Sequence, residues 1–342
     1  MIRSLRPISG LTAALLLVAA GSTDAAPVAK NGRIVFQRLD PRLGKTRLYT
    51  VQADGRGLRP LTTPRGNDDG DSEADWSPDG RKIVFRRFVN RGLPNERLDL
   101  YVVGADGRVL RDLTSATCAR PCLSNEEPAW SPDGKRIAFA RTIGPVPANG
   151  GPPPIVGIFV MNADGTHVRQ VTQRKPNSGT EDHAPTWSPD GKRIAFMRAN
   201  NTAKPQEASA VWVMNADGTH AGVLRSMSHR WPGAGAPAWS PDGTWILYST
   251  SCWFGDCGQP RTGAQLFTIR PDGSGSRRLT HLSGNVEPGR WSPDGRKIVF
   301  TRNVRVGPAG DVYTINANGS GLRRLTRAPD LDAGNPDWGR RG

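Results

Sequence analysis

The sequence lacks several features that identify common classes of protein. Its longest apolar run, Leu11 to Ala20, has about half of the roughly 20 residues that a membrane-spanning helix needs. There is no Gly-x-Ser-x-Gly elbow of the kind that carries a hydrolase nucleophile, and no nucleic-acid-binding motif. With 40 glycines and 29 prolines, the chain is also a poor candidate for a helical bundle. We therefore expect many short strands joined by frequent turns.

The first 26 residues differ in character from the rest. Arg3 and Arg6 precede the apolar run, and small residues follow it, which is the pattern of a secretory signal peptide. We expect a signal peptide at residues 1–25, cleaved after Ala20 or Ala25, and no transmembrane segment after cleavage. The location would then be extracytoplasmic, in the periplasm, the cell wall or the medium.

Cysteine is scarce, with four residues in the whole chain. They form two local pairs, Cys118 with Cys122 and Cys252 with Cys257, in segments rich in loop residues. An exported protein can hold such pairs as disulfides, which is what we expect here. Free thiols are one alternative, and a four-cysteine zinc site is another, although the CxxC spacing of zinc ribbons is missing.

Basic residues outnumber acidic ones. The chain has 46 lysines and arginines and 31 aspartates and glutamates, which gives a formal net charge of +15. A basic protein attracts anions without specificity. For an exported protein these anions are wall polymers, acidic polysaccharides or lipid headgroups, and we expect no nucleic-acid partner.

What the sequence does contain is repetition. The decapeptide WSPDGRKIVF occupies residues 76–85 and returns unchanged at 291–300, with variants at 130–139, 187–196 and 239–248. A second phrase, of the form LYVVGADGRVLRDLT, alternates with the first in six copies. The tryptophans of the repeat recur every 47 to 57 residues, a period that fits the blades of a propeller.

Each repeat predicts four strands. Ser-Pro-Asp-Gly forces a tight turn between the first and second strands, and Ala-Asp-Gly does the same between the third and fourth. The second strand is apolar on consecutive residues, as in Ile83, Val84 and Phe85, which indicates burial on both faces. Both kinds of turn lie on one side of the sheets, which we call the turn face. The longer connections lie on the opposite side, the loop face.

The two ends of the chain complete each other. Residues 31–38, NGRIVFQR, are a second strand without its tryptophan strand, and residues 335–339, NPDWG, are a tryptophan strand without its second strand. The sequence therefore predicts an all-β fold over residues 26–342. We expect a six-bladed β-propeller of four-stranded blades, with the ring closed by pairing of the N- and C-terminal segments in one blade.

The phrases Trp-Ser-Pro-Asp-Gly-(Lys/Arg)-x-Ile-(Ala/Val)-Phe and Asn-Ala-Asp-Gly resemble the WD40-like repeat of the TolB propeller family. The resemblance covers residues 31–342 and implies an exported propeller. TolB proteins carry a further α/β domain before the propeller, and we expect no counterpart of it here, since the first strand follows closely on the signal peptide.

The segments that enter the tryptophan strands are acidic, and repetition would direct them toward one channel mouth on the loop face. A ring of carboxylates suits a divalent cation such as calcium, for which we predict Glu73, Glu127, Asp182 and Glu287, or a basic segment of a partner. Further ligand-binding candidates are Asp71, Glu126, His183 and Trp253. The alternative is that these are solvated loop carboxylates that cap strand ends.

The turn face shows the opposite charge. Basic pairs follow most Pro-Asp-Gly turns, at Arg81 and Lys82, Lys135 and Arg136, Lys192 and Arg193, and Arg296 and Lys297, with Arg33 in the first repeat. They either form a basic ring for an anionic surface or merely solubilise the turns.

We expect a monomeric, non-catalytic scaffold that binds an envelope or extracellular protein, or an anionic wall polymer, through the loop face. The alternative is a metal- or carbohydrate-binding propeller with hydrolase or lyase activity at the channel mouth.

Overall fold

The structure is a computed structural model. It describes residues 29–66, 68, 70–93, 95–118, 122–144, 155–173, 179–200, 209–226, 234–250, 263–287, 289–303, 310–327 and 333–342. The signal peptide expected at residues 1–25 lies outside these residues. Within them the chain forms strands and turns, and no helix capable of crossing a bilayer occurs in this part of the protein.

The strands of the first half of the chain are β1 (Asn31–Asp40), β2 (Lys45–Val51), β3 (Arg59–Pro60), β4 (Gly70–Trp76), β5 (Lys82–Val89), β6 (Arg97–Gly104), β7 (Arg111–Asp112), β8 (Cys122–Trp130), β9 (Arg136–Ile143), β10 (Ile155–Asn162) and β11 (Arg169–Gln170). Those of the second half are β12 (Thr180–Trp187), β13 (Arg193–Asn200), β14 (Ser209–Asn215), β15 (Gly222–Ser226), β16 (Ala234–Trp239), β17 (Ile246–Thr250), β18 (Leu266–Ile269), β19 (Arg277–Arg278), β20 (Asn285–Val286), β21 (Arg290–Trp291), β22 (Lys297–Asn303), β23 (Asp311–Asn316), β24 (Arg323–Arg324) and β25 (Ala333–Arg340).

The strands form antiparallel units of the order predicted from the repeat. Each unit runs from an inner tryptophan strand through two long middle strands to a short outer strand, as in β4-β5-β6-β7 and β12-β13-β14-β15. The apolar segment of each second strand is buried, as predicted: Ile83, Val84 and Phe85 have no exposed surface. The apolar side chains on both faces of this strand therefore pack against neighbouring sheets.

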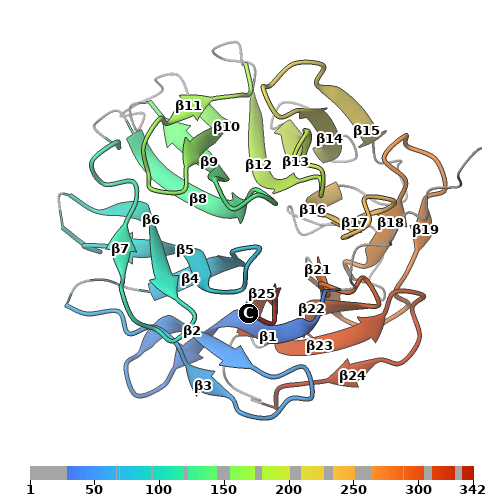
Figure 1. Ribbon diagram of the computed structural model, residues 1–342, viewed down its shortest axis with the longest axis horizontal. Helices are drawn as coiled ribbons and strands as arrows, with labels where there is room; N and C mark the ends of the chain where they lie inside the picture. Colours follow the sequence, from blue (N-terminus) through green and yellow to red (C-terminus); the bar gives the residue numbers. More distant parts are fainter. Residues whose placement is uncertain are drawn as a thin grey trace, which may run out of the picture.

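The units stand around a common centre, with the inner strands β4, β8, β12, β16, β21 and β25 nearest to it (Figure 1). Strand β25, from the end of the chain, pairs antiparallel with β1, from its beginning, so that Trp338 lies opposite Ile34. One hydrophobic cluster joins Ile34, Phe36 and Val51 to Val299 and Val312, across the first and last units. The fold is thus an all-β propeller.

Neighbouring units also meet through a contact that recurs around the molecule. A carbonyl oxygen of each outer segment lies so close to the glycine of the next unit's Asp-Gly or Asn-Gly turn that a Cβ there would come within 2.1–3.2 Å of it. Only glycine fits this approach, and its positive φ also favours glycine. The pairs are Leu61 with Gly107, Leu113 with Gly165, Val171 with Gly218, Leu224 with Gly273, Leu279 with Gly319, and Leu325 with Gly55.

We predict that replacing Gly339 by alanine destabilises the protein, because β25 packs on the first full unit at this residue. A Cβ at Gly339 would lie 2.6 Å from the ring of Trp76, and overpacking of this kind costs typically about 1–3 kcal/mol. Gly222→Ala is the matched control, since nothing lies within 4 Å of a Cβ there. The thermal midpoint should fall by a few degrees for Gly339→Ala alone. Equal midpoints for both variants would contradict the packing described for β25.

Candidate functional site

The inner strands share a β-bulge three residues before the tryptophan. At this position the backbone is left-handed in residues other than glycine, with φ between 42° and 53°. The residues are Glu73, Glu127, Ala184, Ala236 and Asn335. The strand pairing skips at the same place in each case. A bulge re-aims side chains at the end of a strand, and here it turns them toward the centre of the molecule.

A chain of hydrogen bonds stabilises these bulges. The Glu73 backbone N–H donates to Gln37 Oε1 (3.2 Å), and the Glu127 N–H donates to Glu73 Oε2 (2.9 Å). The Ala184 N–H donates in turn to Glu127 Oε2 (2.7 Å). Each acceptor side chain thus comes from the preceding unit. These bonds offset a left-handed conformation that costs roughly 1–2 kcal/mol per residue, and they fix the carboxylates at the centre.

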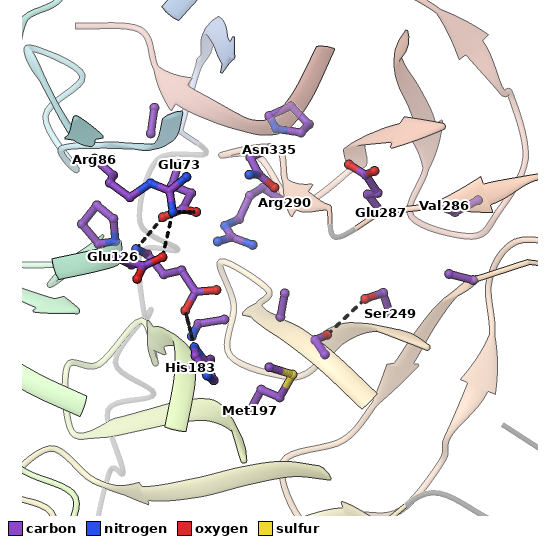
Figure 2. A pocket seen from close by; sticks show the side chains of 18 of the residues that line it. Glu73, Arg86, Glu126, His183, Met197, Ser249, Val286, Glu287, Arg290 and Asn335 are labelled. Carbon is purple, nitrogen blue, oxygen red and sulfur yellow. Dashed lines mark hydrogen bonds and ion pairs between the residues drawn. The ribbon is translucent and has the colours of Figure 1, made fainter. Parts of the chain in front are cut away.

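The bulges line a cavity of about 640 Å³ at the loop-face end of the inner strands. Its ionisable lining consists of Glu73, Arg86, Glu126, Glu127, His183, Glu287 and Arg290. Figure 2 shows these groups converging from several units, with the Arg290 guanidinium pointing into the space between them. Four of the acidic residues predicted from the sequence and the predicted His183 are thus brought together.

Much of this acidity is neutralised by the protein itself. Arg86 bridges two carboxylates, with Nη1 lying 3.0 Å from Glu73 and 2.7 Å from Glu126. His183 lies between two more, with Nδ1 3.4 Å from Glu127 and Nε2 3.3 Å from Glu181. The cavity is therefore a balanced set of charges and not the open ring of carboxylates that the sequence predicts.

The surroundings shift the pKa values of three of these groups. Burial and the neighbouring carboxylates Glu127 and Glu126 raise the pKa of Glu73 to about 7, against the opposing charge of Arg86. Burial opposes the charge of His183, but its hydrogen bonds to Glu127 and Glu181 outweigh that effect and raise its pKa to about 10. Burial likewise opposes ionisation of Glu127, but His183 more than compensates, so the pKa of Glu127 is lowered.

Arg290 differs from the other cations of the cavity. Its Nη1 donates to the Gly289 carbonyl (3.3 Å), and it forms no ion pair with any carboxylate in the described part of the chain. Its charge acts on the buried carboxylates of Asp75 and Asp337, whose pKa values burial raises and Arg290 partly lowers. These two carboxylates accept the backbone N–H groups of Trp130 and Trp76, each at 2.7 Å. Both carboxylates thus accept backbone N–H groups within the fold, and Arg290 lines the cavity beside them.

Two of the predicted site residues lie elsewhere. Asp71 and Asp182 are fully buried, where Asp71 forms a bidentate pair with Arg87 (2.6 and 2.9 Å) and Asp182 one with Arg198 (2.7 and 3.0 Å). Both stand five residues before a tryptophan, a position that faces the interior of the sheet and not the cavity. Sequence reasoning treated these segments as loops, whereas they belong to β4 and β12.

Residues of the predicted metal set contact other side chains. Asp182 is held by Arg198, Glu127 contacts His183, and Glu287 accepts the Asn303 amide at 2.8 Å. In the described ranges no group of three or more histidine, cysteine, aspartate or glutamate side chains is arranged to hold a metal ion. The calcium site proposed at Glu73, Glu127, Asp182 and Glu287 stays a prediction.

The remaining predicted positions are only partly described. Trp253, Cys252 and Cys257 lie outside the described residues, and so does the side chain of Cys122. Cys118 is buried and disulfide-bonded, while its pairing with Cys122 stays a prediction.

Sequence reasoning missed the basic residues of the cavity. Arg86 follows the buried IVF segment directly, and Arg290 replaces the small or acidic residue found before most of the other tryptophans. Asn335, at the bulge of β25, was also missed. A comparison of the residue immediately before each tryptophan would have identified Arg290 as an exception.

Comparison with known proteins gives the same architecture. Residues 75–256 match the family described as TolB beta propeller domain. The uncharacterized protein Atu1656 of Agrobacterium fabrum is 26% identical over 230 residues, which cover 66% of this chain and 63% of that protein. The Tol-Pal system protein TolB of Anaeromyxobacter dehalogenans is 36% identical over 103 residues, or 30% of this chain and 21% of that protein. The chain thus spans less than two thirds of either relative.

Among solved structures, TolB from Acinetobacter baumannii superimposes with a TM-score of 0.65 at 18% identity, covering 90% of this chain and 66% of that one. At this level of identity the likeness concerns the fold.

We predict that stability falls as the pH rises, in two steps that belong to different residues. The folded state holds a proton on Glu73 between pH 4.5 and about 7, and one on His183 between pH 6.5 and about 10, where the unfolded state has lost each proton. The free energy of unfolding therefore decreases through both windows, by on the order of 1–3 kcal/mol each. Urea unfolding across pH 4–10 measures this decrease.

Glu73→Gln should flatten the acidic step, and His183→Gln the alkaline step, relative to the unmodified protein. Glu96→Gln, at an exposed glutamate, is the control that should leave the profile unchanged. A Glu73→Gln profile parallel to the wild-type profile below pH 7 would show that Glu73 ionises normally.

Proposed function

The chain belongs to the TolB beta propeller family, and on that premise we propose that it is a non-catalytic binding protein of the cell envelope. The central cavity on the loop face receives a polar segment of a partner protein. The observation that carries this proposal is the cavity of about 640 Å³ in which Arg290 faces the interior while Glu73, Glu126 and Glu127 are paired with Arg86 and His183. A concave site with a few convergent polar groups is the usual form of a ligand-binding site.

The charge pattern indicates which part of the partner enters. Glu73, Glu126 and Glu127 are held by Arg86 and His183, so a basic segment would have to compete with these ion pairs. Arg290 forms no ion pair in the described residues, and a guanidinium binds a carboxylate in a bidentate geometry. The partner segment therefore presents an aspartate, a glutamate or a terminal carboxylate to Arg290.

Three further features belong to this proposal. The antiparallel units form six blades, and the ring is closed through the pairing of β1 with β25 and the donation of the Arg323 guanidinium to the Asp54 carbonyl (2.6 Å). The protein is exported and acts as a monomer outside the cytoplasm, supported by the signal-peptide pattern at residues 1–25. Disulfides Cys118–Cys122 and Cys252–Cys257 constrain the loops of the loop face.

A second candidate function rests on Glu73. A carboxyl with a pKa raised to about 7 at a cavity suits general acid–base chemistry at neutral pH. The alternative is therefore a carbohydrate-binding hydrolase or lyase with Glu73 as the proton donor. Turnover of an oligosaccharide that Glu73→Gln abolishes would support it.

We predict that Arg290→Gln lowers the affinity for envelope proteins at least tenfold, because a hydrogen bond to a charged group contributes about 1.5–3 kcal/mol. Immobilised protein would be incubated with detergent-solubilised cell envelope, and the captured proteins quantified. Arg296→Gln removes the same charge from the turn face and should leave capture unchanged.

Thermal midpoints of both variants establish that each is folded. Equal capture by wild type and Arg290→Gln would refute the role of the cavity. Equal losses of capture in both variants would show that the binding is nonspecific charge attraction.

A further inference from the structure

The turn face carries one interruption of its repeated structure. In most units the outer segment carries an arginine. It lies two residues before the residue whose carbonyl meets the glycine of the next unit. Its guanidinium donates to a backbone carbonyl of the next unit's turn. The pairs are Arg59 with Ala105 (3.5 Å), Arg111 with Asp164, Arg169 with Ala216 (3.4 Å), Arg277 with Ala317 (3.4 Å) and Arg323 with Asp54 (2.6 Å).

Between the β12–β15 and β16–β19 units this arginine is replaced by Gly222. The backbone contact itself is kept, because the Leu224 carbonyl still lies against Gly273. The two units thus meet as the others do, and only the side chain is missing. A Cβ at Gly222 would find nothing within 4 Å, so the space that an arginine occupies elsewhere is open here.

A hollow of about 730 Å³ is found at this junction, lined by Arg193, Thr244, Trp245, Arg270, Pro271 and Asp272. Trp245 is a second departure from the repeat, since the equivalent positions hold Lys82, Arg136, Arg193 and Lys297. An aromatic residue thus replaces a cation in the lining of this hollow. The two exceptions to the repeat, Gly222 and Trp245, thus belong to the two units that line the hollow.

The hollow is positively charged. The guanidinium groups of Arg270 and Arg277 lie 5.4 and 5.3 Å from the centre of the Trp245 ring, and Arg193 lies over Trp239 at 4.8 Å. Neither Arg193 nor Arg270 forms an ion pair with a described carboxylate. The carboxylate of Asp272 accepts the Ser274 N–H of its own turn (2.8 Å). The net field of the hollow therefore attracts an anion.

We propose that this hollow binds a carboxylate-bearing sugar residue of an acidic polysaccharide. The carboxylate lies between Arg193 and Arg270, whose planar forks match its geometry, and the apolar face of the sugar ring lies against Trp245. A bare inorganic anion would use the arginines but not the indole. This site is on the turn face and does not depend on the function proposed for the central cavity.

The test is the affinity of the full-length mature protein for a hexamer of glucuronic acid, measured by titration calorimetry at physiological salt. Cellohexaose is the neutral match, and sodium sulfate is the anion without a sugar ring. We expect binding of the uronate hexamer only, with affinity reduced at least tenfold by Trp245→Ala and by Arg270→Gln.

The decisive variant is Gly222→Arg. By analogy with Arg59, which donates to the Ala105 carbonyl, the restored guanidinium should reach the equivalent carbonyl of Pro271 and occupy the hollow. Attraction of an anion by charge alone would strengthen when a cation is added, whereas binding in the hollow should weaken at least tenfold. Leu58→Arg adds the same charge beside another junction of the turn face and should not weaken binding.

Unchanged or tighter binding by Gly222→Arg would overturn the proposal, as would equal affinity for sulfate and the uronate hexamer. Because Gly222→Arg copies a contact made at the other junctions, its thermal midpoint should not fall, so loss of binding cannot be attributed to unfolding.

Discussion

The left-handed bulge three residues before the tryptophan is the constraint on which the centre of this protein depends. It places Glu73 and Glu127 at the cavity, and it is held by backbone N–H groups that donate to the side chain of the preceding unit. The same carboxylates thus stabilise a strained backbone and define the polar lining. Replacing one of them changes the join between two units as well as the charge of the cavity.

This double role explains why the cavity is not a simple acidic site. Carboxylates gathered from separate units repel one another, and buried charges persist only when they are paired. Arg86 and His183 supply the pairing, and the raised pKa of His183 follows from its place between Glu127 and Glu181. Arg290, in contrast, forms no ion pair in the described residues, and the proposal of an acidic partner segment rests on this cation.

The repeats were sufficient to predict the fold but not the arrangement of the site. The tryptophan phrase and its turns were enough to predict the four-stranded units and the buried IVF strands. Register was not predictable in the same way. Asp71 and Glu73 are separated by one residue, yet the former is buried against Arg87 and the latter lines the cavity, because the bulge shifts the alternation of side chains. The residues on which the two proposals rest, Arg290, Gly222 and Trp245, are exceptions to the repeat, and a search for residues common to all repeats does not find them.

The most direct test of this account is the protonation state of His183, followed by nuclear magnetic resonance of the imidazole nitrogens from pH 5 to pH 11. If the ring is held between Glu127 and Glu181 as described, both nitrogens keep their protons through pH 8, and the pKa lies near 10. A histidine that loses its proton near pH 6.5 would show that the carboxylates of the cavity are not paired by the protein, and would return the site to the acidic ring predicted from the sequence.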